Sequence, residues 1–487
     1  MNTRRILLFS SLILLAFLTA TCRHDDPVVE TTGFPNQVGK IIMTRCAITG
    51  CHNSVSAPNA AGLDMTTWNS MFMGDRSGNS VTIPFSHRFS TTFIFTNTYP
   101  DLGASHPPTP MPFNSAKLTH DEEVTIKSWI NEGAPDRNGM IKFADNANRK
   151  KVYVLNAGCD VVTVFDEGTG LPMRYVLVGT GSPLDGPHEI EVSPDGRFWC
   201  VVFLQYPYMQ FFNCSDDSYA GQAYLGYDSY TAISFTPDSR KVFTVGIDKG
   251  KIDEIDVNTF TTMDTLQCAA NIGLHGMSLN PSGNALYVTL QNNGNTLCKF
   301  YPSADSLGHY ISIPVDGTKN GTSNPYTEPH DIAFSGNRYY VTLQHSNQVA
   351  VMDAVKDTLI TLIPVGVKPQ DMAVSSYRNL LFVSCIDDTL TFPGKRGSVY
   401  VIDMNTNSVK ATVDVGWQPY GVAVDEDRGL VYVVNTNVSP TGPAPHHNTD
   451  CGGRNGFVTF IDLNTLRLIP GKKVELAAFP RSIAKRN

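Results

Sequence analysis

The sequence predicts a multidomain chain in which a small all-α domain precedes an all-β seven-bladed β-propeller. Residues 35–137 carry apolar side chains at helical spacing and a well-marked helix start and stop. Residues 151–487 instead repeat short β-branched and aromatic strands bounded by turn residues. With 487 residues and 41% apolar content, the chain is long enough to bury more than one core.

The N-terminus predicts export and a lipid anchor. Residues 1–21 begin with the charged Arg4-Arg5 pair and continue with an apolar run too short to span a bilayer as a stop-transfer helix. Cys22 follows small residues that resemble a relaxed bacterial lipobox, in which the cysteine is acylated. Residues 22–34 would then tether the body to a membrane, on the periplasmic or cell-surface side. The alternative is a plain signal peptide with an incidental cysteine.

Three helices are expected within residues 35–137. The first spans Asn36 to Cys46 and the second lies around Leu63 to Met73. The third has Thr119 as its N-cap, with Glu122 three residues later, and ends at Gly133. Its expected apolar face comprises Val124, Ile126, Trp129 and Ile130. Such helices would enclose an apolar slot.

The segment Cys46-Ala47-Ile48-Thr49-Gly50-Cys51-His52 carries the chemistry of a covalent haem attachment site. Two thiols form thioethers with the porphyrin vinyl groups, and the adjacent imidazole of His52 ligates the iron. The segment therefore predicts one covalently bound haem c. Two alternatives remain: a local disulfide between the cysteines, or a zinc site that includes His52 but has no evident fourth ligand at short spacing.

A sixth iron ligand is expected between the second and third helices. Met111 lies in a proline-stiffened loop, residues 106–112, which would hold its thioether with little entropy left to lose. The alternatives for this position are Met65, His87 and His106.

These features together resemble the planctomycete-type cytochrome c domains. The shared features are the cysteine–cysteine–histidine start, a Gly62-Leu63 helix, a Met-Pro loop and a closing helix that reads Trp-Ile-Asn-Glu-Gly-Ala-Pro over residues 129–135. The resemblance covers about a hundred residues and implies coordination of the iron by His52 and Met111. The four residues between the cysteines depart from the commonest spacing.

The remaining two-thirds of the chain repeats four strand elements seven times. An inner strand recurs every 40 to 61 residues, and the alignment of its first residue gives His188, Thr231, His275, His330, Gln370, Tyr420 and Arg481. The phase of the repeats places strands two to four of the first blade from Lys151, whereas its inner strand would be Arg481 to Lys485. The C-terminus is therefore expected to close the ring. Residues 138–150 form a linker.

The repeats resemble the YVTN family of propellers. The signature of its second strand, Tyr-Val-Thr-Asn, is matched at three of four positions by Tyr153-Val154-Leu155-Asn156 and by Tyr287-Val288-Thr289-Leu290. This resemblance implies a fold and leaves the function open.

The first residues of the inner strands are expected to line the mouth of the central channel. His188, His275 and His330 would converge there, where three imidazoles offer a possible metal or cofactor site. The alternative is structural, with these polar side chains bonding to neighbouring blades. Further polar residues in nearby long loops are His345, His446, His447 and Cys451.

Ten cysteines in an exported chain raise the question of disulfides. When Cys22, Cys46 and Cys51 are assigned to lipid and haem, an odd number remains. These are Cys159, Cys200, Cys214, Cys268, Cys298, Cys385 and Cys451. Their scatter through strand-like segments argues against a disulfide scaffold and predicts that most of them are small buried hydrophobes.

The predicted function is that of a membrane-tethered c-type cytochrome. Its haem would transfer electrons, and the propeller would present a site for a redox partner protein, a metal or a small-molecule substrate. An electron carrier is favoured over a self-contained enzyme, because no nucleophile–base constellation or phosphate-binding loop is evident. A net charge of −8 without a basic cluster argues against nucleic acid. The alternative is a recognition propeller with an accessory redox or structural haem domain.

Overall fold

The computed structural model describes residues 31–103, 109–181, 185–267, 273–291, 294–302, 311–317, 327–447, 449 and 451–486. The predicted export signal and the positions of Cys22, His106 and Cys268 lie outside these residues. Within the described part of the chain, no helix is both long and apolar enough to cross a membrane.

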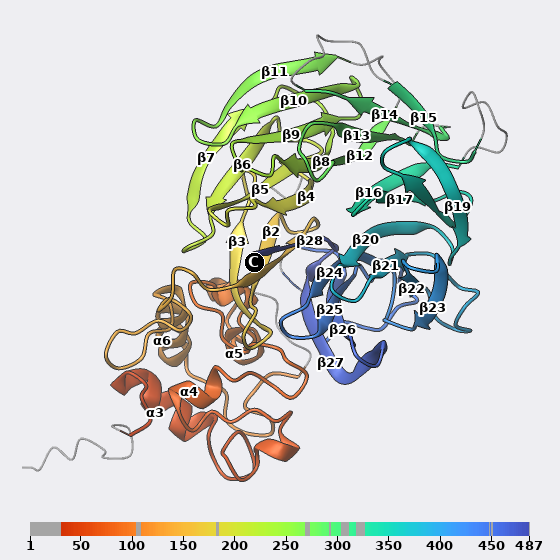
Figure 1. The fold of residues 1–487 in the computed structure, drawn as a ribbon. Coiled ribbons are helices and arrows are strands. Elements are labelled where there is room, and N and C mark those ends of the chain that lie inside the picture. The colour runs from red at the N-terminus through yellow and green to blue at the C-terminus, as the bar shows by residue number, and fades with distance from the viewer. Residues whose placement is uncertain are drawn as a thin grey trace, which may run out of the picture.

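The C-terminal two-thirds of the chain forms seven four-stranded antiparallel sheets arranged as blades around an axis (Figure 1). Blade 1 comprises β28 (Pro480–Arg486), β1 (Lys151–Asn156), β2 (Val161–Asp166) and β3 (Leu171–Leu177). Blade 2 comprises β4 (Pro187–Val192), β5 (Phe198–Phe203), β6 (Tyr208–Asn213) and β7 (Tyr219–Tyr224). Blade 3 comprises β8 (Tyr230–Phe235), β9 (Lys241–Gly246), β10 (Lys251–Asp256) and β11 (Thr261–Gln267). Blade 4 comprises β12 (Leu274–Leu279), β13 (Leu286–Leu290), β14 (Thr296–Phe300) and β15 (Ile311–Pro314). Blade 5 comprises β16 (Pro329–Ser335), β17 (Arg338–Leu343), β18 (Gln348–Asp353) and β19 (Thr358–Pro364). Blade 6 comprises β20 (Pro369–Ser375), β21 (Leu380–Cys385), β22 (Ser398–Asp403) and β23 (Ser408–Val413). Blade 7 comprises β24 (Pro419–Asp425), β25 (Leu430–Asn435), β26 (Asn455–Asp462) and β27 (Arg467–Ala478). The predicted seven-bladed β-propeller is confirmed.

The C-terminal strand closes the ring of blades. β28 pairs antiparallel with β1, with Lys151 opposite Arg486 and Tyr153 opposite Ala484. An inner strand supplied by the opposite end of the chain pairs with the inner edge of β1, which would otherwise be free to template pairing with another chain. The expectation drawn from the phase of the repeats is therefore correct.

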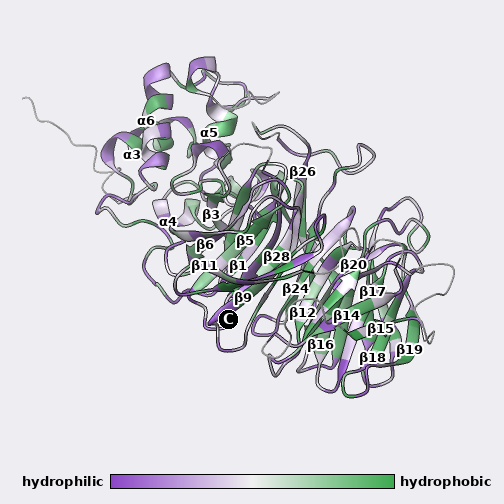
Figure 2. Cartoon of the chain, turned by 90° about the horizontal axis from the view of Figure 1, so that it is seen from above, coloured by the Kyte–Doolittle hydropathy of each residue, from purple (hydrophilic) through white to green (hydrophobic). Residues whose placement is uncertain are grey.

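Burial explains why the middle strands are almost continuously apolar. β1 and β2 are buried along their whole length, because neighbouring blades cover both faces of each sheet. Outer strands such as β23 are largely exposed and alternate apolar with polar residues. Figure 2 shows hydrophobic residues running through the propeller strands and hydrophilic stretches on helices α3 and α6.

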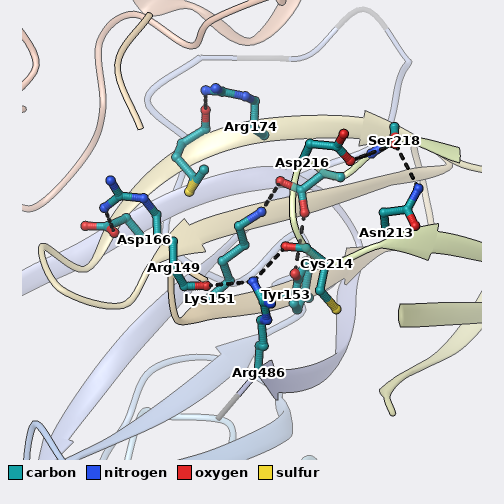
Figure 3. A network of polar contacts seen from close by, with 12 residues as sticks. Arg149, Lys151, Tyr153, Asp166, Arg174, Asn213, Cys214, Asp216, Ser218 and Arg486 are labelled. Atoms are coloured by element: carbon teal, nitrogen blue, oxygen red, sulfur yellow. Dashed lines mark hydrogen bonds and ion pairs between the residues drawn. The ribbon is translucent and has the colours of Figure 1, made fainter. Parts of the chain in front are cut away.

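A buried polar network joins blades 1 and 2 beside the point of closure (Figure 3). The Lys151 ammonium lies 2.8 Å from Asp217 Oδ2, and both side chains are almost fully buried. Arg486 donates from Nη1 to the carbonyls of Arg149 and Cys214, at 3.2 and 3.0 Å. The network thus connects both ends of the propeller chain to the turn after β6.

The helices lie in residues 36–131, where turns and loops connect short elements. These are α3 (Asn36–Arg45), η1 (Ala57–Asn59), α4 (Trp68–Met71), η2 (His87–Phe89), α5 (Thr91–Thr96), η3 (Pro100–Leu102) and α6 (His120–Asn131). The second predicted helix shrinks to α4, because Thr67 caps it in a capping box and so fixes a later start. The third begins after Thr119 as predicted, with the Thr119–Glu122 capping box formed.

Helices α3 and α6 pack together. Arg45 donates from Nε and Nη2 to the two carboxylate oxygens of Glu122, at 3.1 and 3.2 Å. Ile126 and Trp129 on α6 are buried as predicted, but Val124 is 38% exposed and the face includes Glu123 instead. The buried face follows the spacing of 123, 126 and 130, which places Val124 on the solvent side.

The helical region lies against the outer strands of blades 1 and 7. Phe89 stacks on Tyr175 of β3 with ring centroids 4.2 Å apart. Ser80 Oγ donates to the Pro172 carbonyl at 2.5 Å, and the Glu475 amide of β27 donates to Asn79 Oδ1 at 2.8 Å. Stacking and backbone hydrogen bonds therefore fix this region on the side of the propeller.

A disulfide joins Cys159 to Cys451, with Cα atoms 5.3 Å apart and a sequence separation of 292 residues. These two cysteines are exceptions to the prediction that most of the seven are buried hydrophobes, because ring closure brings the β1–β2 turn beside the loop before β26. Cys200, Cys214 and Cys385 are free and buried, as predicted, and Cys298 is also buried.

Removal of this disulfide is expected to destabilise the propeller. A Cys159→Ser/Cys451→Ser variant should lose about 2–4 kcal/mol of unfolding free energy, since its unfolded chain is no longer constrained. Urea unfolding of the variant and the oxidised protein would measure the difference. Wild-type protein treated with reductant should match the variant; equal stability of all three would contradict the expectation.

Candidate functional site

The Cys46–His52 segment forms a compact loop at the end of α3. The amides of Cys46 and Ala47 both donate to the Ile42 carbonyl, at 2.9 and 2.8 Å. The His52 amide then donates back to the Cys46 carbonyl at 3.1 Å. These bonds bring the histidine beside the first cysteine despite the four-residue spacer.

Burial favours the neutral forms of the Cys46 thiol and the His52 imidazole. Burial, followed by the nearby Glu123 carboxyl, raises the pKa of the Cys46 thiol to about 12. Burial also lowers the pKa of His52 below its usual range. His52 Nδ1 is buried and has no hydrogen-bond partner, and Cys46 and Cys51 are not joined by a disulfide. A neutral imidazole with an unpartnered nitrogen beside two free thiols fits covalent haem attachment, since neutral imidazole is the form that binds a metal.

The Met111 loop is fixed by its backbone. The Met111 amide donates to the Phe95 carbonyl of α5 at 2.7 Å. Lys117 Nζ donates to the carbonyls of Pro110 and Pro112, at 2.7 and 2.6 Å, on either side of the methionine. The Met111 side chain is 36% exposed. The loop thus holds its backbone while the thioether stays accessible.

Two of the other ligand candidates occupy different surroundings. Met65 is buried, and its amide donates to the His52 carbonyl at 2.8 Å, so the backbone places it beside the predicted proximal ligand. His87 Nδ1 lies 2.8 Å from Asn131 Oδ1, and its ring contacts Phe93. His106 lies outside the described residues.

Glu123 belongs to this region, although the sequence interpretation omitted it. Its side chain is fully buried, and Oε2 accepts a hydrogen bond from Thr96 Oγ1 at 3.1 Å, whereas Oε1 has no partner. Burial raises the pKa of Glu123 to about 7. The signal was present in the sequence, because Glu123 precedes Ile126 by three residues and Ile130 by seven on one helical face.

A Glu123→Gln substitution is expected to change how stability depends on pH. An unfolded glutamate has a pKa of about 4.3, so between about pH 4 and pH 7 the folded protein holds a proton that the unfolded chain has released. The free energy of unfolding of the wild-type protein should therefore fall by about 3 kcal/mol across this window relative to Glu123→Gln. Urea titrations at several pH values would measure it, with exposed Glu132→Gln as control. Parallel curves for Glu123→Gln and wild type would contradict the assignment.

The inner strands bring the three predicted propeller histidines together at the axis. The ring centroids of His188 and His275 lie 5.6 Å apart, and those of His275 and His330 lie 4.3 Å apart. Thr231, Gln370, Tyr420 and Arg481 occupy the same position on the other four inner strands. All of these residues except Arg481 line a small cavity of about 70 Å³, together with the acidic residues Glu189, Asp331 and Asp371.

Hydrogen bonds occupy three of the six ring nitrogens of the axial histidines, whereas His275 Nδ1 is buried without a partner. His188 Nδ1 lies 3.0 Å from the Thr231 carbonyl, and its Nε2 lies 2.8 Å from Arg481 Nη2. His330 Nδ1 lies 3.1 Å from the Gln370 carbonyl. Burial lowers the pKa of all three imidazoles, with the Arg481 cation adding to the effect on His188 and His275. Across the described residues, no group of three or more histidine, cysteine or acidic side chains is placed to hold a metal ion.

A second set of polar side chains lies one residue further along the inner strands. Glu189 accepts from Ser482 Oγ at 2.9 Å. Asp331 and Asp371 both accept the Met372 amide, at 3.0 and 2.8 Å. Burial raises the pKa of Glu189 to about 8 and of Asp331 to about 6, and burial and Asp331 raise that of Asp371. Alignment of the first inner-strand residue alone had missed this acidic set.

Two histidines of the long loop before β26 face the helical region. The Phe95 ring lies 5.0 Å from His446 and 6.2 Å from His447. Glu475 accepts from both of their amides, at 2.8 and 3.3 Å. Because Phe95 also accepts the Met111 amide, this loop is the part of the propeller that approaches the predicted ligand loop. His345 donates its amide to the Thr327 carbonyl at 3.1 Å.

Comparison with known proteins gives partial likenesses. No family model matches the chain. Over 193 residues, or 37% of its length, the chain is 28% identical to Antigen Lp49 of Leptospira interrogans serogroup Icterohaemorrhagiae serovar copenhageni, and the match spans 40% of that protein. Kuenenia stuttgartiensis Hydrazine Synthase superposes with a TM-score of 0.48 at 16% identity, over 62% of this chain and 90% of that one. Neither likeness assigns the chain to a family, and such a TM-score supports no argument about activity.

Proposed function

We propose that this protein is a c-type cytochrome that transfers electrons through one haem attached at Cys46 and Cys51. The observation that carries the proposal is the loop at the end of α3, in which backbone hydrogen bonds bring His52 back to Cys46 and leave His52 Nδ1 unpartnered. His52 and Met111 would be the axial ligands. When bound, the haem would supply reversible one-electron chemistry.

The surrounding residues would favour this role in two ways. Burial of His52 keeps its imidazole neutral and available for iron, without a proton to displace near neutral pH. The clamp of Lys117 on the carbonyls beside Met111 limits the positions that the thioether can reach. A methionine axial ligand raises the reduction potential, which suits a carrier that accepts electrons from weak donors.

The propeller would present the surface to which a partner docks. The loop with His446 and His447 packs against the Phe95 ring, and the Phe95 carbonyl accepts a hydrogen bond from the Met111 amide. A redox partner protein or a small-molecule donor bound at this face would lie next to the helical region. Export and acylation at Cys22 would place the protein at a membrane surface, in a compartment where the Cys159–Cys451 disulfide persists.

A redox titration tests this function. The protein would be co-expressed with the bacterial cytochrome c maturation machinery and titrated with ascorbate and then ferricyanide while its visible spectrum is recorded. We expect a reversible one-electron transition. A haem that binds but does not exchange electrons with soluble mediators would favour the alternative of a recognition propeller with a structural haem.

Replacement of Met111 by alanine is expected to lower the haem reduction potential and remove the sulfur-to-iron charge-transfer absorption, because the thioether no longer ligates iron. Met140→Ala is the matched control, since Met140 is also an exposed methionine, at 49%, and lies in the linker that follows the helical region. Met65→Leu separates the two candidates. Loss of the absorption in Met65→Leu with its retention in Met111→Ala would transfer the ligand role to Met65.

A further inference from the structure

Helix α6 carries a carboxyl group that is buried without a counter-charge. The Glu123 side chain is fully buried, and Thr96 Oγ1 donates to its Oε2 at 3.1 Å, whereas Oε1 is buried with no hydrogen-bond partner. Within the part of the chain that the structure describes, Glu123 forms no ion pair, and Arg45 of α3 directs its guanidinium to the neighbouring Glu122. The charge of such an uncompensated carboxyl responds to any change in the charge around it.

The contact of α3 with α6 places Glu123 beside Cys46. Arg45 and Glu122 form two hydrogen bonds, at 3.1 and 3.2 Å, and each directly precedes one of these two residues in the chain. After burial itself, the Glu123 carboxyl is the largest cause of the raised pKa of the Cys46 thiol. The carboxyl is therefore coupled electrostatically to a cysteine that the proposed function assigns to haem attachment.

A second contact connects Glu123 with the loop of the proposed sixth ligand. Thr96, which donates to Glu123, follows Phe95 in α5, and the Phe95 carbonyl accepts the Met111 amide at 2.7 Å. Glu123 thus lies between the end of α3 at Cys46 and the part of α5 that holds the Met111 backbone. A change in charge at a haem attached here would act on this carboxyl through an interior of low dielectric constant.

The other titratable groups on the elements packed around Glu123 have partners of their own or are exposed. The paired ones are Glu122 with Arg45, His120 with Asp101, Lys127 with the Leu102 carbonyl, and His87 with Asn131 at the opposite end of α6. The exposed ones are Lys40, Arg88 and Asp121, which solvent screens. Helix α5 carries no charged residue. Glu123 is therefore the buried group in this region whose charge is set by its surroundings.

We propose that Glu123 is a redox-linked proton acceptor, which binds one proton from solvent when the haem gains an electron and releases it when the haem is oxidised. The electron passes between the iron and a one-electron redox partner, and the proton passes between solvent and the Glu123 carboxylate. Each reduction thus adds one negative and one positive charge to the buried region and leaves its net charge unchanged. This inference rests on the proposed electron-transfer function and adds proton uptake to it.

The expected effect is a reduction potential that depends on pH. An ionised carboxylate stabilises the oxidised, more positive iron, so loss of the proton from Glu123 lowers the potential. Burial raises the pKa of Glu123 to about 7, which places the transition near neutral pH. Between about pH 5 and about pH 9, the redox equilibrium constant should fall at least fivefold, which is about 40 mV for a one-electron couple.

Spectroelectrochemical titration of the haem-loaded protein at several pH values tests the proposal. Glu123→Gln, which is neutral like the protonated carboxyl, should match the wild-type potential at low pH, exceed it at high pH and no longer vary with pH. A purely structural role would shift the potential equally at every pH. Glu132→Gln, which removes an exposed carboxylate after α6, should keep the wild-type pH dependence. A wild-type potential that is independent of pH, or an equal pH dependence in Glu123→Gln, would overturn the proposal.

Two further measurements do not depend on the folding of Glu123→Gln. Near neutral pH, reduction of the wild-type protein should add the carbonyl stretch of a protonated carboxyl to the reduced-minus-oxidised infrared spectrum. Thr96→Val removes the hydroxyl that partly offsets the effect of burial on the pKa of Glu123, so it should move the transition to higher pH without abolishing it. Absence of the infrared band, or a Thr96→Val transition that stays in place or moves to lower pH, would overturn the proposal.

The proton-acceptor role and the electron-transfer function can fail separately. A protein that carries no haem would overturn electron transfer and, with it, the role of Glu123. A reversible haem potential that does not respond to pH would overturn the role of Glu123 alone and leave electron transfer standing.

Discussion

An Asp217→Ala variant is expected to lose about 3–5 kcal/mol of unfolding free energy, because it leaves the Lys151 ammonium buried without a counter-charge. The two groups lie 2.8 Å apart with side-chain exposures of 2% and 3%. Burial lowers the pKa of Lys151 and raises that of Asp217, which is the sign that desolvation costs both ions. Lys151 is the first residue of β1 and pairs with the closing strand β28. The substitution should therefore weaken the closure of the propeller ring.

The neighbouring residue provides a matched control. Lys150 pairs with Asp427 on the surface, where the two side chains are 48% and 60% exposed. Asp427→Ala should therefore leave the free energy of unfolding almost unchanged. Urea unfolding followed by tryptophan fluorescence would measure both, since buried Trp199 lies in the same part of blades 1 and 2. Equal losses for Asp217→Ala and Asp427→Ala would show that the buried pair is not a determinant of stability.

The second large effect concerns haem attachment. Cys46→Ala/Cys51→Ala is expected to abolish covalent haem, because both thioethers are lost. Cys385→Ala is the control, since this free and buried cysteine lies on β21 in the propeller. Denatured-gel haem staining would compare the three proteins. A haem signal that survives in the double variant, or that disappears in Cys385→Ala, would contradict the assignment.

The propeller was predictable because its signals are periodic. Each blade repeats the same apolar strands, and the phase of the repeats revealed that the last strand belongs to the first blade. The register of β28 with β1 is the physical result of that phase. The seven inner-strand positions also emerged from alignment, which is why His188, His275 and His330 meet at the axis.

The helical region was less predictable because its signals are local. The Thr119 capping box set the start of α6 correctly, since the cap depends on side chains three residues apart. Val124 was assigned to the apolar face on hydrophobicity alone, although helical spacing favours Glu123. A buried carboxyl violates the simple rule that charges lie outside, and it does so where Cys46 and Glu123 approach each other.

Contacts between segments that are distant in the chain could not be predicted from the sequence. The Cys159–Cys451 pairing depends on ring closure over 292 residues, which no spacing rule encodes. The contact of Phe95 with His446 depends on how the helical region packs on the propeller. The acidic set of Glu189, Asp331 and Asp371 at the axis could be recognised only from the arrangement of the inner strands in the structure.

Intact-protein mass spectrometry combined with a pyridine haemochrome assay tests the central claim most directly. Full-length protein exported by a host that carries the cytochrome c maturation machinery would be denatured and measured. We predict one covalently bound haem per chain, on the peptide that contains Cys46, Cys51 and His52. A chain without haem, with these cysteines free, joined to each other or bound to zinc, would contradict the account.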